Sequence, residues 1–164
     1  MASMDRRQLL ALMPEIALAW QHAQHAAKAP PRVLKTLTKA EAATLDAALG
    51  RMIPADELGP GAREAGLLYF IDHALGSFAR SDREAYRTGL AKLAGLDKLD
   101  AAAQDAALRA IETTPFFDKL RTHVCFGMFG NPEYGGNQDK AGWKLIGFDD
   151  AFVFTPPFGD YDRV

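Results

Sequence analysis

The chain has 164 residues, of which 48% are hydrophobic and 24% charged, and its net charge is −2. This length fits a single domain with a substantial core. The near balance of charge argues against nucleic-acid binding, which leaves an excess of Lys and Arg, and no run approaches the roughly 18 apolar residues of a membrane-spanning helix. The single cysteine, Cys125, excludes an internal disulfide, and its apolar neighbours predict an inert core residue.

Residues 1–30 have the order of features that is typical of an export signal. The pair Arg6 and Arg7 precedes a leucine-rich stretch and an end rich in small residues, and paired arginines indicate the twin-arginine route. Pro14 and Glu15 interrupt the apolar stretch. The alternative is therefore an amphipathic N-terminal helix that stays on the mature protein.

A capping box predicts the first helix of the domain. Thr38 and Glu41 have the spacing in which the hydroxyl accepts a hydrogen bond from a helix N–H and the carboxylate reaches back to the cap. Pro54 ends this helix. The apolar residues between them share one helix face: Ala42, Leu45, Leu49 and Met52.

A more apolar helix is predicted to follow the turn around Pro60. Proline is favoured at the first position of a helix, because its missing N–H is not needed there. A stripe at helical spacing predicts the buried face of this helix, and its residues are Leu67, Ile71, Ala74 and Phe78.

Two or three further helices are predicted before Gly130. Ser81 and Glu84 repeat the capping-box spacing, an Ala/Leu-rich segment follows, and Thr114-Pro115 supplies a cap and a first helical residue. No segment alternates apolar and polar residues as a half-buried strand does. We therefore predict an all-α domain, a compact bundle of four to five short helices.

The helical pattern stops at about Gly130, and residues 130–164 are predicted to form a long, irregular tail of the same domain, which spans residues 31–164. This tail is rich in glycine and aromatic residues. Because exposed aromatic residues in such number usually contact something, we expect the tail to lie across a surface, either its own or that of another chain.

Catalytic motifs are not evident in the sequence. His22 and His25 could share a helix face but lack a third metal ligand. His73 and His123 are expected to be hydrogen-bonded at the edge of the core. No C-x-x-C-H sequence is present for a covalently attached haem. An independent enzyme that uses His123 with a carboxylate is a possible but unsupported interpretation.

Two stretches carry a family resemblance. One is IPADELGPGAREAGLLYFID at residues 53–72, and the other is LRTHVCFGMFGNPEYGGNQDKAGWKLIGF at residues 120–148. The second is specific, because many positions match at fixed spacing. Over roughly residues 36–150 the chain resembles the gluconate 2-dehydrogenase subunit 3 family, the small subunits of bacterial flavin-dependent sugar and sugar-acid dehydrogenases.

The resemblance implies a small subunit that carries no redox cofactor. From the residues themselves we expect no metal site and no activity of this chain alone. The resemblance also implies a large FAD-bearing partner of the glucose-methanol-choline type, such as gluconate 2-dehydrogenase or glucoside 3-dehydrogenase, and a third, cytochrome c subunit with haem c. A working twin-arginine signal would take the folded pair to the periplasm, associated with the inner membrane through the complex. Without that signal, export would have to be encoded on the partner, or the complex stays in the cytoplasm.

We expect the glycine- and aromatic-rich stretch to contact the large subunit, with aromatic anchors supplying most of the binding energy. The residues expected at this contact are Phe129, Tyr134, Gly135, Gly136, Asn137, Trp143 and Phe148. One alternative is a loop that packs only on its own helices. Another is that the chain is a transient assembly or export chaperone of the flavoprotein, which leaves the mature complex.

Overall fold

The structure, a computed structural model, describes residues 32–148 and residue 150. These residues contain the following α-helices: α3 (Lys39–Met52), α4 (Leu67–Gly76), α5 (Arg83–Lys92), α6 (Ala101–Ile111), α7 (Pro115–Phe129) and α8 (Ala141–Leu145). Four 3₁₀ turns lie between them: η1 (Arg80–Asp82), η2 (Leu96–Lys98), η3 (Pro132–Tyr134) and η4 (Gln138–Lys140). The predicted all-α class is confirmed. The predicted export signal, with Arg6 and Arg7, and the tail beyond residue 150 lie outside the described residues.

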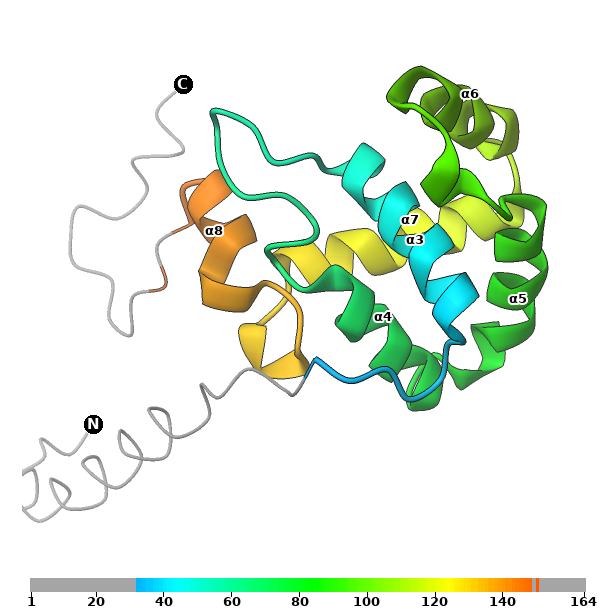
Figure 1. The fold of residues 1–164 in the computed structure, drawn as a ribbon. Helices are drawn as coiled ribbons and strands as arrows, with labels where there is room; N and C mark the ends of the chain where they lie inside the picture. The colour runs from blue at the N-terminus through cyan, green and yellow to red at the C-terminus, as the bar shows by residue number, and fades with distance from the viewer. Residues whose placement is uncertain (1–31, 149, 151–164) are drawn as a thin grey trace, which may run out of the picture.

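Helix α7 runs through the length of the fold (Figure 1). Helices α5 and α6 lie toward its first turns, and α8 lies at its last turns. Helix α4 packs on α7, and α3 packs against α4, α5, α6 and η2. This arrangement places the glycine-rich stretch at the end of α7 away from α5 and α6.

Side-chain caps start three of the helices. Thr38 and Glu41 form both bonds of the predicted capping box at α3. Thr114 accepts a hydrogen bond from the Phe117 N–H, and Pro115 is the first residue of α7, as predicted. Asp100 caps α6 by accepting from Ala103 N–H at 2.9 Å.

Two predicted helix starts are wrong. Helix α4 does not begin near Pro60, because Gly66 adopts a left-handed conformation with φ +75° that separates the preceding turns from the helix. Ser81 and Glu84 do not form a capping box. Turn η1 continues directly into α5, and Asp82 before it already has helical dihedral angles, so no side chain caps this start.

One cluster of apolar side chains forms the core. Residues at most 1% exposed within it are Leu45, Ala48, Leu49, Ala62, Ala65, Leu67, Ile71, Leu75, Tyr86, Leu96, Leu120 and Met128. Leu108 and Ile111 of α6 also face inward, as their helical spacing predicts.

Two residues that were predicted to be buried are exposed. Phe78 is 67% exposed, because α4 ends at Gly76 and the stripe does not continue on a helix. Cys125 is exposed because it lies on the outer face of α7, whereas His123 and Val124 on the same helix are buried. The predicted core role of Cys125 is therefore wrong.

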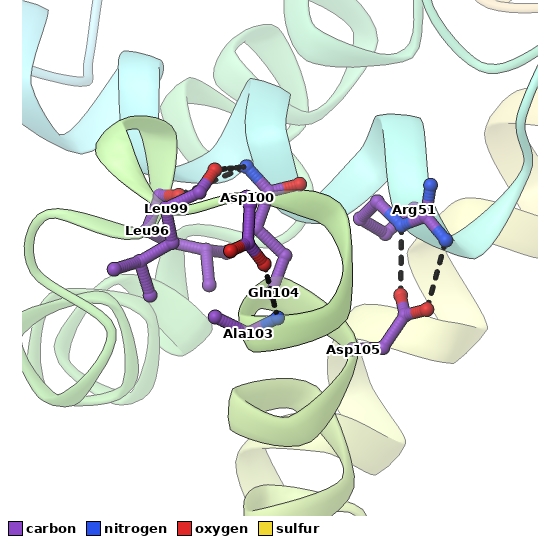
Figure 2. Close-up of polar contacts among 7 residues, drawn as sticks. All are labelled: Arg51, Leu96, Leu99, Asp100, Ala103, Gln104 and Asp105. Atoms are coloured by element: carbon purple, nitrogen blue, oxygen red, sulfur yellow. Dashed lines mark hydrogen bonds and ion pairs between the residues drawn. The ribbon is translucent and has the colours of Figure 1, made fainter.

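Polar contacts attach α6 to the rest of the fold (Figure 2). Arg51 of α3 and Asp105 of α6 form a bidentate pair, with N–O distances of 2.7 and 2.8 Å. The Gln104 side chain donates to the carbonyl oxygens of Leu96 and Leu99, which binds the start of α6 to η2. The side-chain hydrogen bond from Arg51 lowers the pKa of Asp105, and burial partly opposes this effect.

The stretch from residue 130 to residue 148, here called the C-terminal segment, is not irregular as predicted. It contains η3, η4 and the short helix α8. The helical spacing of apolar residues did not predict these elements. Each is no longer than five residues, which is too short to show a repeated apolar face.

Candidate interaction surface

Asn137 organises the C-terminal segment. It is fully buried, with 0% exposure, and its backbone N–H donates to the carbonyl oxygen of Gly127 on α7 at 2.6 Å. Its side-chain amide donates to Gly130 O at 2.9 Å, and its side-chain oxygen accepts from Gly142 N–H at 2.8 Å. One side chain therefore joins the end of α7 to the start of α8.

The glycines of this stretch lie against the chain's own α7. A Cβ added to Gly136 would overlap the backbone of Gly127, and one added to Gly142 would overlap the carbonyl of Met128. Gly127 is itself close-packed, since an added Cβ would lie 2.7 Å from the ring of Phe70 on α4. The close approach that the glycines permit is therefore used inside this chain.

A strained turn completes the connection between η3 and α8. Asn137, Asp139 and Lys140 have positive φ values of 45°, 55° and 57°. Such values are uncommon for residues other than glycine and persist only where surrounding contacts fix them. Here the fixing contacts include Gln138 N–H to Ala65 O at 3.1 Å, which ties the turn to the segment before α4.

Trp143 connects two further aromatic residues of the predicted contact. Its ring N–H donates to the carbonyl oxygen of Phe129 at 2.8 Å. Its ring packs on Phe148 with a centroid separation of 5.0 Å, and the Phe148 N–H donates to Trp143 O at 2.8 Å. Trp143 is half-buried in this position.

The structure separates the predicted contact residues into two groups. Gly135, Gly136 and Asn137 are buried in the chain and position the others. The aromatic residues remain accessible: Tyr134 is 71% exposed, Phe148 51% and Phe129 36%.

Two residues that the sequence interpretation did not select extend this exposed group. Phe126 lies one turn before Phe129 on α7, and Ile146 follows α8; each is 59% exposed. The i, i+3 spacing of Phe126 and Phe129 was the available signal. We call the full set the aromatic surface: Phe126, Phe129, Tyr134, Trp143, Ile146 and Phe148.

A polar cluster lies between η1, α5 and the middle of α7. The Tyr86 hydroxyl of α5 lies 2.8 Å from His123 Nδ1, and His123 Nε2 lies 3.7 Å from a carboxylate oxygen of Asp82. Lys119 forms an ion pair with the same carboxylate at 2.6 Å. Burial lowers the pKa of His123, while Asp82 raises it and Lys119 lowers it further. Burial also raises the pKa of Tyr86.

The two rings of this cluster are buried. His123 is only 6% exposed and Tyr86 is fully buried, with its ring edge-on to Phe116 and stacked on His123. The predicted hydrogen-bonded role of His123 at the edge of the core is confirmed. His73 lies on α4, with its Nε2 at 3.4 Å from Val33 O.

A groove of about 360 Å³ lies between α5 and the beginning of α7. The ring of Phe116 fills the space beside Gly89, and Glu84 and Lys92 also line the groove. The groove does not include His123 or Asp82. Within the described part of the chain, no three His, Cys, Asp or Glu side chains gather as a metal site requires, and no helix is long and apolar enough to cross a membrane.

The described residues form a small all-α domain with several large apolar side chains exposed at the end of α7 and on the C-terminal segment. The family model described as gluconate 2-dehydrogenase subunit 3 matches residues 39–150. The chain belongs to this family, and both stretches that carried the resemblance lie within the match. No curated protein and no solved structure matches the chain.

Proposed function

We propose that this chain is a non-catalytic subunit that binds and stabilises a large FAD-dependent sugar or sugar-acid dehydrogenase subunit of the glucose-methanol-choline type. Membership of the subunit 3 family supports a place in a dehydrogenase complex. The large subunit carries the FAD and selects the sugar, and a cytochrome c subunit accepts the electrons. In this proposal the twin-arginine segment of this chain directs the folded pair to the periplasm.

The aromatic surface is the observation that supports direct binding of this chain to the large subunit. Six large apolar side chains are at least partly accessible, two at the end of α7 and four on the C-terminal segment, whose backbone is tied to α7 and to Ala65. A segment held in this way loses little conformational freedom on binding, so more of the contact energy appears as affinity. Aromatic residues are also the side chains that most often dominate protein interfaces.

The proposal is tested by co-expressing the tagged chain with the large subunit and measuring the affinity of the purified pair. Tyr134 is the best position for substitution, because it is the most exposed of the six residues. We expect Tyr134→Ser to weaken the complex by about 2 kcal/mol, which is roughly thirtyfold, if it is an interface anchor. Trp143 is a poorer first choice, because it also holds Phe129.

Leu99→Ser is the matched control. Leu99 is 46% exposed and lies between η2 and the start of α6, and α6 is at the far side of the fold from α8 (Figure 1). This variant should bind the large subunit as the wild type does. Equal binding by the Tyr134 and Leu99 variants would place the contact elsewhere. A stable one-to-one complex in detergent-free extracts supports a permanent subunit, whereas association only before export supports a transient chaperone.

A further inference from the structure

The chain leaves the described part of the structure at the aromatic surface. The Phe148 ring packs on Trp143, and its backbone N–H is bonded to Trp143 O. Two residues later, the Asp150 carboxylate forms an ion pair with Lys140 of η4 at 2.7 Å. The described part of the chain therefore ends beside this surface.

Residues 151–164 are rich in aromatic side chains, like the aromatic surface itself. Residues 151–164 read AFVFTPPFGDYDRV, and aromatic residues occur at Phe152, Phe154, Phe158 and Tyr161. Two adjacent prolines restrict the backbone, which lowers the entropy lost when such a segment binds. Aromatic rings gain from offset or edge-to-face contacts with other rings.

The segment is also long enough to reach the whole surface. An extended chain spans at most about 3.3–3.6 Å per residue, so these residues can reach roughly 45 Å from Asp150. Helix α7, on which Phe126 and Phe129 lie, is only about 22 Å long by its helical rise. A ligand tethered this close has an effective concentration in the millimolar range.

We propose that residues 151–164 bind the aromatic surface of their own chain and cover it until a partner displaces them. The segment then acts as a built-in competitor that keeps the surface from associating with other apolar surfaces. This inference does not depend on which protein the partner is, and its tests use the chain alone.

The direct test is photo-crosslinking in the full-length chain. A benzoylphenylalanine in place of Phe154 changes one ring into a larger one, and mass spectrometry identifies the peptide to which it attaches. We expect attachment to residues 126–148 of the same chain, with a yield independent of protein concentration. Attachment to other helices, attachment only between two chains, or no attachment would overturn the proposal.

A second test measures the accessibility of Trp143 by iodide quenching. Trp20→Phe removes the other tryptophan, so the fluorescence reports Trp143 alone. The substitutions F152S, F154S and F158S together should raise the quenching constant about twofold, because they remove the covering rings. V153S with T155A alters the same stretch without removing a ring and should leave quenching unchanged. Unchanged quenching in the triple variant, with wild-type circular dichroism, would contradict the proposal.

Discussion

The side-chain oxygen of Asn137 accepts a hydrogen bond of 2.8 Å from the backbone N–H of Gly142. The same amide donates to Gly130 O, so one buried residue determines where α8 lies relative to the end of α7. The positions of Trp143 and Phe148, which follow Gly142 in the chain, depend on this bond. Buried polar residues with several partners specify a unique arrangement in this way.

Asn137→Ala should therefore destabilise the fold strongly. It leaves the Gly142 N–H and the Gly130 carbonyl without their side-chain partner, and each unpaired buried polar group costs about 1–3 kcal/mol. We expect a loss of roughly 2–4 kcal/mol in the free energy of unfolding, measured by urea denaturation. Asn131→Ala is the control, because Asn131 is exposed and its side chain accepts one local hydrogen bond, from Glu133 N–H. Equal losses in the two variants would show that Asn137 has no special role.

Gly142→Ala should disrupt the packing of α8 on α7. The added methyl group meets the backbone carbonyl of Met128, which cannot rotate away as a side chain could. We expect a loss of about 3 kcal/mol in the free energy of unfolding. In Gly59→Ala the new methyl group would lie 3.4 Å from Leu145 Cδ1, an ordinary contact. That control should change the stability by less than about 0.5 kcal/mol, and a similar effect of both substitutions would contradict the packing argument.

Asp72 is expected to hold the start of the domain. This fully buried carboxylate accepts hydrogen bonds from the N–H groups of Lys35, Thr36 and Leu37, at 2.7, 2.9 and 2.7 Å. Asp72→Ala leaves three N–H groups without this partner and should cost about 3 kcal/mol or more. Trypsin should then cleave after Lys35 faster than in the wild type.

The control for Asp72 is Asp97→Ala, which removes an exposed carboxylate from η2. It should leave both the stability and the rate of cleavage after Lys35 close to their wild-type values. If Asp72→Ala is cleaved no faster than this control, the carboxylate does not anchor the segment.

The stability should fall when the pH drops below about 6.5, the ordinary pKa of a histidine in the unfolded chain. Burial lowers the pKa of His123 in the folded state, so the unfolded state binds a proton first as the solution is acidified. The contribution of neutral His123 is complete above that pH and is lost progressively as the pH falls toward the folded-state pKa.

Urea denaturation between pH 5 and pH 8 checks this expectation. His123→Gln should be less stable than the wild type at pH 8, because the Tyr86 hydroxyl loses its ring-nitrogen partner. Its stability should also depend less on pH between 5 and 7. Parallel pH profiles for the two proteins would show that His123 does not cause the acid sensitivity.

Local patterns were sufficient to predict most of the helical scaffold. The Thr38–Glu41 capping box and the Thr114-Pro115 start are confirmed because each depends on residues within one helical turn. The start near Pro60 failed because the left-handed Gly66, six residues later, interrupts the backbone. A dihedral angle of this kind is selected by the packing around it, which here includes the Gln138 side chain.

The sequence by itself determined the family, the all-α class and the residues in which glycine and aromatic side chains concentrate. These features can be read from composition and local spacing, because helix caps and the helical spacing of apolar residues depend only on residues close in sequence. Only the tertiary structure decided which of those residues are buried and which are accessible. Gly136 and Asn137 follow the exposed Tyr134 by only two and three residues but lie against Gly127 on α7. That division follows from long-range backbone contacts, which no local pattern specifies.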